Sequence, residues 1–217
     1  MTTRKGIDVS KYNDPSIIEK LKPDFVIIRA GYGKGHLDRN FCAHVATCSK
    51  LNIPYGVYWF SYATSITDVI NEANHCIDTI FRAYNTMENC KLPEYPIFFD
   101  WEGDSERYYN KANNMPFSTF MYNEFVEAFC STVEYYGFWA GVYCDKSHFC
   151  KLNTQRFTVW LADWTNTPKF EYSSPVLMQQ TGAEEHDGKL VDVNITNIDF
   201  PTAVHKKGLN HWKRRRK

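Results

Sequence analysis

The chain has 217 residues, of which 43% are apolar and 16% aromatic, and this composition suits one well-packed domain. The 25 basic and 25 acidic residues balance, and we expect no nucleic-acid partner. No apolar run approaches the ~18 residues of a membrane span, and the polar start Met1-Thr-Thr-Arg-Lys is unlike a secretory signal. We therefore expect synthesis in the cytoplasm and no membrane insertion. Seven cysteines without a CxxC pair argue against a disulfide framework or a zinc ribbon.

The predicted elements alternate between strand and helix through the first two thirds of the chain. Apolar helical spacing at residues 15–21, 38–51, 67–84 and 116–136 predicts helices, with a shorter one at 146–151. This alternation predicts an α/β fold with a parallel sheet, and the helical pattern thins after residue 143. We predict one barrel domain at residues 1–204. Its eight strands are expected at residues 5–8, 24–29, 54–60, 95–99, 138–143, 157–161, 175–179 and 190–193.

The fourth predicted strand, Tyr95-Pro-Ile-Phe-Phe-Asp100-Trp101-Glu102, carries two carboxylates at its C-terminal end. Residues i and i+2 of a strand share a face, so Asp100 and Glu102 should project together, with backbones roughly 6–7 Å apart. Paired carboxylates repel, which raises the pKa of one and leaves a proton-donating acid beside a carboxylate. Acetal cleavage requires that pair, so the segment predicts sugar chemistry. The alternative is a strand that ends in two solvated acids.

Acids also occur in the first and last predicted strands, as Asp8 in Lys5-Gly-Ile-Asp8-Val-Ser10 and Asp192 in Leu190-Val-Asp192-Val-Asn194. The first and last strands of an eight-stranded barrel are neighbours. Asp8 and Asp192 should therefore lie side by side, across from Asp100 and Glu102. Of the latter two, Glu102 has aromatic neighbours such as Trp101 and is the better candidate for desolvation and a raised pKa.

The residues from His205 onward carry seven Lys or Arg and no acid, whereas residues 1–204 hold 18 basic against 25 acidic residues. We expect residues 205–217 to be a flexible basic tail. It is either a solubilising end or a tether to an anionic polymer, such as nucleic acid, a membrane surface or cell-wall phosphate.

Seven strings of the sequence occur in an order typical of one known family. They are GIDVS at 6–10, FVIIRAGYG at 25–33, IPYGVYWFSYA at 53–63, PIFFDWEG at 96–103, YGFWAGVYC at 136–144, VWLADW at 159–164 and DGKLVDVN at 187–194. Over residues 5 to about 200 the chain thus resembles the glycoside hydrolase family 25 lysozymes, or Chalaropsis-type N-acetylmuramidases. The resemblance implies an irregular TIM-type (β/α)₅β₃ barrel with its active site at the C-terminal ends of the strands. It also implies cleavage of the β-1,4 bond between N-acetylmuramic acid and N-acetylglucosamine in peptidoglycan, without a cofactor or metal.

The resemblance also implies roles for individual residues. Glu102 corresponds to the proton donor and Asp100 to its partner carboxylate. We favour a route in which the sugar's own 2-acetamido group is the nucleophile and Asp100 orients it, and other routes stay open. The chain has Met178-Gln179-Gln180 where the family usually has Trp-Gln-Tyr. Residues expected to line the bound glycan, with core packing as the alternative for the aromatic ones, are Asp8, Asp192, Tyr58, Tyr62, Tyr143, Trp160, Asp163 and Trp164.

Production without a signal peptide suggests a phage endolysin or a virion-packaged muramidase that acts on the bacterial cell wall. The partners expected are glycan strands and, through the basic tail, anionic wall polymers.

Two other classes of protein are alternatives to the glycoside hydrolase. Clustered acids can hold Mg²⁺ or Ca²⁺ in a metal-dependent phosphoesterase. A non-catalytic wall-binding or virion-structural module is the second alternative, although a binder gains nothing from a buried pair of repelling acids.

Overall fold

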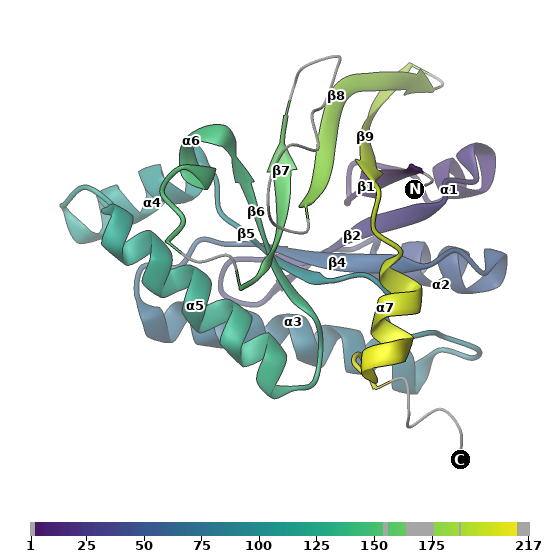
Figure 1. Cartoon of the computed structure of the whole chain (residues 1–217), viewed down its shortest axis with the longest axis horizontal. Coiled ribbons are helices and arrows are strands. Elements are labelled where there is room, and N and C mark those ends of the chain that lie inside the picture. The colour runs from purple at the N-terminus through teal and green to yellow at the C-terminus, as the bar shows by residue number, and fades with distance from the viewer. Residues whose placement is uncertain (1–2, 154–155, 164–175, 187, 212–217) are drawn as a thin grey trace.

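A single curled sheet, closed into a barrel, forms the centre of the computed structural model (Figure 1). The structure describes residues 3–153, 156–163, 176–186 and 188–211. The order of strands is β1-β9-β8-β7-β6-β5-β4-β2-β3, and a further pairing between β1 and β2 closes the ring. The strands are β1 (Arg4–Val9), β2 (Phe25–Tyr32), β3 (His36–Leu37), β4 (Tyr55–Phe60), β5 (Ile97–Asp100), β6 (Ala140–Asp145), β7 (Thr158–Ala162), β8 (Val176–His186) and β9 (Lys189–Thr196).

Most neighbouring strands run parallel, which places their C-terminal ends at one mouth of the barrel. Strand β9 differs because it runs antiparallel to both β1 and β8. The short strand β3 was not expected and pairs antiparallel with the end of β2. In Figure 1 the β8–β9 hairpin extends beyond the rest of the barrel. The predicted irregular TIM-type barrel is confirmed.

Helices pack against the outside of the barrel at β2, β4, β5, β6 and β7, and α3 packs beside α5 along one side of it (Figure 1). Among the described residues, no helix is both long and apolar enough to cross a membrane. The helices are α1 (Ser16–Leu21), α2 (Phe41–Leu51), α3 (Ile66–Thr86), α4 (Gly103–Asn113), α5 (Thr119–Tyr135), α6 (Lys146–Phe149) and α7 (Phe200–Lys207).

Two of these helices, α4 and α7, are absent from the sequence prediction. Helix α4 buries only Ser105 and Tyr109, so it lacks the apolar stripe on which helix prediction depends. Helix α7 buries only Phe200 and Val204 and is short. Its start does carry a local signal, because Asp199 accepts a hydrogen bond from the Thr202 N–H and Pro201 occupies the first turn.

Alternation along the strands separates two apolar clusters. In β2, Val26 and Ile28 belong to the larger cluster between the sheet and the helices, whereas Phe25 and Ile27 belong to the cluster inside the barrel. In β5, Phe98 lies inside and Phe99 outside by the same rule. Asp100, two residues after Phe98, is therefore on the inward side of its strand.

The end of the barrel opposite the mouth is closed by aromatic residues and by the chain that follows β9. The Phe200 ring lies 5.1 Å from that of Tyr95 and 5.5 Å from that of Trp139, measured between centroids. Asn210 is buried and accepts a hydrogen bond of 2.8 Å from the Trp139 N–H. His205 lies 2.6 Å from a Glu94 carboxylate oxygen. The expectation of a flexible tail from residue 205 is therefore wrong for residues 205–211, because they pack on the barrel.

Candidate active site

Four predicted acids are held around the barrel mouth by three strands and one helix start. Asp8 is in β1, Asp100 ends β5, Asp192 is in β9, and Glu102 immediately precedes α4. Asp100 is 3% exposed, and its Oδ1 has no hydrogen-bond partner among the described residues. The charges of Glu102 and Asp8 both act on Asp100, so the structure brings these three acids together.

The protonation behaviour of the pair differs from the expectation in one respect. Burial raises the pKa of Asp100 well above its ordinary value, and the charges of Glu102 and Asp8 raise it further, against an opposing effect of Arg29. Burial also raises the pKa of Glu102, helped by Asp104 and Asp145. Glu102 was expected to be the more desolvated acid, but Asp100 is the deeper one. The reason is that Asp100 points into the barrel, whereas Glu102 lies at the rim.

Glu102 is fixed by the first turn of α4. Its backbone is extended, its N–H donates to Ser105 Oγ at 3.2 Å, and its carbonyl accepts from the Glu106 N–H at 3.0 Å. Trp101 turns to the other side and stacks on Phe117 at 4.4 Å in the outer core. Trp101 is therefore a buried anchor that fixes the chain between the two acids, not an apolar wall beside Glu102.

Asp8 is held by the buried side chain of Asn194, which was not among the predicted site residues. Asn194 is fully buried; its Nδ2 donates to Asp8 Oδ2 at 2.9 Å, and its Oδ1 accepts from Trp160 Nε1 at 2.9 Å. The indole can only donate and the carboxylate can only accept, so the amide has one satisfying orientation. Only the spacing hinted at Asn194, since it lies two residues after Asp192 on the same face of β9.

Asp192 lies where β9 passes the C-terminal end of β1. The register pairs Ile7 with Val193 and Gly6 with Asn194, which places Asp192 next to Asp8 across the sheet. Asp192 is exposed as a whole residue, but its carboxyl group faces the other acids at the mouth, and its partial burial there raises the pKa of Asp192. Its charge also raises the pKa of Glu102. The predicted neighbourhood of the acids is therefore present in the structure.

Three of the predicted aromatic residues line the interior of the barrel below the acids. Tyr58, Tyr143 and Trp160 are buried, and the Trp160 ring lies 5.6 Å from Tyr58 and 4.7 Å from Tyr143. The pKa of Tyr143 is raised by burial and by Asp100. These residues form a packed floor under the acids, as the core-packing alternative predicted, and their contact with a glycan stays a prediction.

Tyr62 lies at the rim and is partly exposed, with its ring 5.3 Å from that of Tyr108. Its pKa is raised by burial and by the charges of Asp104 and Glu102. Tyr108 is 45% exposed and belongs to α4, the helix that the sequence did not predict. The two rings provide an accessible aromatic surface beside Glu102.

A second exposed aromatic group surrounds Arg29, which the sequence reading also missed. Arg29 is fixed by an ion pair of 2.8 Å with the buried Asp38. Its guanidinium lies 5.5 Å from the Tyr12 ring centre and 5.8 Å from that of Tyr32. Tyr12 is 71% exposed. Arg29 thus brings a fixed positive charge toward Asp100 from a neighbouring part of the mouth.

Two further predicted residues have different outcomes. Asp163 is buried, and its Oδ1 lies 2.7 Å from Lys146 Nζ. This ion pair joins the end of β7 to α6, so part of the Asp163 carboxylate is already engaged within the protein. Trp164 lies outside the described residues.

No group of three or more His, Cys, Asp or Glu residues in the described part of the chain is arranged to hold a metal ion.

The barrel and the acids at its mouth define a glycoside hydrolase of the α/β-barrel class. The sequence matches the family described as "Glycosyl hydrolases family 25" over residues 7–188. The chain belongs to this family, whose members include lysozymes. No curated protein sequence matches the chain significantly.

Solved structures share this fold. The modular autolysin LytC from Streptococcus pneumoniae, in complex with a synthetic peptidoglycan ligand, is 30% identical with a TM-score of 0.70, covering 89% of this chain and 46% of its own. The catalytic domain of endolysin ply40 from bacteriophage P40 of Listeria monocytogenes is 19% identical, with a TM-score of 0.69 and coverage of 94% and 97%. A family 25 lysozyme from Aspergillus fumigatus is 17% identical, with a TM-score of 0.66 and coverage of 94% and 98%. The present chain thus spans about half the length of the autolysin.

Proposed function

We propose that this protein is an N-acetylmuramidase that hydrolyses the β-1,4 bond between N-acetylmuramic acid and N-acetylglucosamine in peptidoglycan. The observation that carries the proposal is the buried Asp100 beside Glu102, two acids with raised pKa values at the mouth of a family 25 barrel. Asp8 and Asp192 complete the acidic lining of the mouth. The autolysin structure with its peptidoglycan ligand supports the choice of substrate.

In the proposed reaction Glu102 donates a proton to the oxygen of the leaving sugar. A raised pKa keeps this carboxyl group protonated at a higher pH than an ordinary glutamic acid. Its position at the rim gives it access to the glycosidic oxygen, while its backbone stays fixed to α4. After the leaving group departs, the ionised Glu102 takes a proton from the attacking water.

Asp100 acts on the sugar that stays in the site. A lone carboxylate is costly in a buried place without hydrogen-bond donors, and a developing positive charge nearby offsets that cost. We propose that Asp100 orients the 2-acetamido group, whose carbonyl oxygen attacks the anomeric carbon and forms an oxazolinium ion. Asp100 then stabilises this ion more strongly than it stabilises the neutral substrate, which favours the transition state.

The products of purified peptidoglycan test this proposal. Borohydride reduction of the new chain ends, followed by mass spectrometry, should yield reduced muramic acid. Reduced glucosamine would instead identify a glucosaminidase, and new free amino groups would identify a peptide-cleaving enzyme. Full activity in the presence of a chelator would reject the metal-dependent phosphoesterase, and any turnover would reject the purely structural module.

We further propose that the enzyme serves phage-mediated lysis or wall penetration. The shared fold of the Listeria phage endolysin domain supports this setting. Addition of the purified protein to intact bacteria, and its production inside them with and without a pore-forming partner, tests the proposal. Lysis from within that requires the pore is the expected result, and lysis without it would contradict release through a pore.

A further inference from the structure

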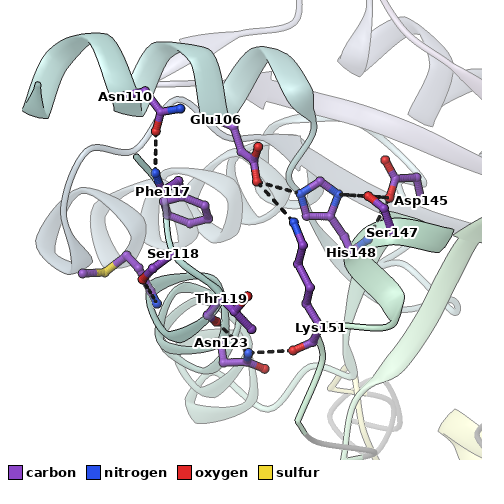
Figure 2. Close-up of polar contacts among 11 residues, drawn as sticks. Glu106, Asn110, Phe117, Ser118, Thr119, Asn123, Asp145, Ser147, His148 and Lys151 are labelled. Atoms are coloured by element: carbon purple, nitrogen blue, oxygen red, sulfur yellow. Dashed lines mark hydrogen bonds and ion pairs between the residues drawn. The ribbon is translucent and has the colours of Figure 1, made fainter. Parts of the chain in front are cut away.

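Three polar side chains connect the end of β6 with the first turn of α4 (Figure 2). His148 Nδ1 lies 3.0 Å from Asp145 Oδ1, and His148 Nε2 lies 3.1 Å from Glu106 Oε1. Asp145 also accepts a hydrogen bond of 2.8 Å from the His148 N–H, as the cap of α6. Asp145 and His148 are three positions apart, whereas Glu106 lies 42 positions before His148 in the sequence.

The histidine is held as a rigid connector. His148 is 4% exposed, and the Tyr122 ring packs against it at 5.2 Å in an edge-on arrangement. Both ring nitrogens face carboxylate oxygens, and the imidazolium form donates to both at once. A buried polar group with two charged partners has little freedom to change its rotamer.

A second connection reinforces the same point on α4. Lys151 Nζ lies 3.8 Å from Glu106 Oε1. The Lys151 carbonyl accepts a hydrogen bond of 2.9 Å from Asn123 Nδ2 on α5. In Figure 2 dashed lines join the Glu106 carboxylate to both His148 and Lys151. Helix α4 is therefore tied through one glutamate to both α6 and α5.

Glu106 lies one helical turn after Glu102. Because the Glu106 N–H donates to the Glu102 carbonyl at 3.0 Å, the direction of the first turn of α4 determines where the Glu102 side chain begins. Strand β6 continues the connection, since Tyr143 in β6 is the register partner of Asp100 in β5. The path from Asp100 through Glu102, Glu106, His148 and Asp145 back to β6 is thus a closed ring of covalent and polar links.

We propose that Asp145, His148 and Glu106 are positioning residues that hold the first turn of α4 so that Glu102 reaches the glycosidic oxygen. This inference rests on the proposed role of Glu102 as the proton donor. The electrostatic surroundings agree with the arrangement: burial raises the pKa of Glu102, Asp145 raises it further, and His148 lowers it. Asp145, His148 and Glu106 therefore affect Glu102 through both geometry and charge, without contact with the substrate.

The test measures kcat and KM of Glu106→Ala, His148→Leu and the double variant on a soluble glycan. A misplaced catalytic group costs up to about 100-fold, so each single variant should lower kcat about 10–100-fold and change KM by less than about threefold. The double variant should lose no more than the worse single variant, because the residues act as one unit. Glu106→Gln keeps an acceptor oxygen and should recover most of kcat.

The matched control is His205→Leu, which breaks a histidine–glutamate contact of 2.6 Å with Glu94 at the other end of the barrel. It should leave kcat unchanged. An equal loss of kcat in His205→Leu, a change confined to KM, or near-normal kcat in Glu106→Ala overturns the inference. If His148→Leu does not fold, Glu106→Ala and Glu106→Gln decide the question alone, because the Glu106 side chain is 29% exposed and the change is less disruptive.

The Glu102→Gln background separates this inference from the proposed function. In that background Glu106→Ala should cause no further loss of the residual rate. High activity of Glu102→Gln itself would overturn both proposals. An inactive Glu102→Gln with a fully active Glu106→Ala would leave the proton donor in place and overturn only the positioning role.

Discussion

Asn194 and Asp8 lie on adjacent antiparallel strands, joined by a hydrogen bond of 2.9 Å from the Asn194 amide to the Asp8 carboxylate. The same amide accepts from Trp160, so one residue connects the aromatic floor to the acidic mouth. Its substitution therefore affects two buried polar groups at once.

We expect Asn194→Ala to lower the free energy of unfolding by about 1–3 kcal/mol, because it removes the hydrogen bonds that the Asn194 amide makes with the Trp160 N–H and with Asp8. Urea titration measures this loss. The variant should also lower kcat/KM, since Asp8 loses a hydrogen bond that helps to orient it. An unchanged unfolding midpoint together with normal activity would show that water replaces the amide without cost.

Glu102→Gln should lower turnover by roughly 10²–10⁴-fold, the range of general acid catalysis, with little change in stability. Asp100→Asn should also be severe. Glu88→Gln is a suitable control, because Glu88 is exposed and lies in the connection between α3 and β5. Rates on soluble glycan and thermal unfolding of all three variants check this prediction. Near-full activity of Glu102→Gln would remove Glu102 from the mechanism.

The alkaline limb of the pH profile should depend on Asp104. Burial is the main cause of the raised pKa of Glu102, and the Asp104 charge is the next. A general acid works in its protonated form, so kcat/KM falls as the pH rises through the Glu102 pKa. Asp104→Asn removes a negative charge that raises the pKa of Glu102. The substitution should therefore lower the pKa of Glu102 and move the alkaline limb of the profile to lower pH. A limb at the same or a higher pH would contradict the assignment.

Glu72 should make the stability of the protein depend on pH. Glu72 is buried in α3, and its Oε1 accepts a hydrogen bond of 3.0 Å from the Tyr62 N–H. Burial raises the pKa of Glu72 from 4.5 to about 7. Between these two values the folded state binds more protons than the unfolded state, so the free energy of unfolding falls as the pH rises. Glu72→Gln should lack this part of the decline. Unfolding at pH 5 and pH 8 compares the two proteins, and identical changes would contradict the prediction.

The end of the chain separates into two parts with different expected effects. Removal of residues 212–217 takes away Lys213-Arg214-Arg215-Arg216-Lys217, and we propose that these five charges tether the enzyme to anionic wall polymers. Hydrolysis of soluble glycans should be unchanged. Binding to walls in a pelleting assay should become less sensitive to salt up to ~0.2 M. Equal salt dependence with and without these residues would exclude the tether.

A longer truncation, from residue 206, should instead destabilise the fold. It removes Asn210, whose Nδ2 donates to the Pro93 carbonyl at 2.8 Å and whose N–H donates to the Gly137 carbonyl at 2.8 Å. Asn210→Ala is the matched point variant, and thermal unfolding should rank it between the short and the long truncation.

The sequence predicts the barrel well because its strands carry strong local signals. The Phe25-Val-Ile-Ile run is apolar on both faces, as a strand between helices and a barrel interior requires, and the Asp100–Glu102 spacing places both acids at one strand end. The roles of Glu106, His148 and Asn194 are different. They depend on contacts between residues far apart in the chain, and helix α4 is stabilised by such contacts despite its polar composition. Local patterns carry no information of that kind.

The antiparallel strand β9 completes the ring by pairing with β1, and the Asp8–Asn194 contact spans 186 positions of the chain. The entropic cost of closing so long a loop must be met before such a contact stabilises the fold. Until β9 is in place, β1 and β8 are open edges, and Asp8 lacks both its amide partner and its neighbour Asp192. During synthesis, therefore, a chain that has not yet released β9 from the ribosome has no complete acidic mouth, and we expect hydrolytic activity to begin only with the last strand.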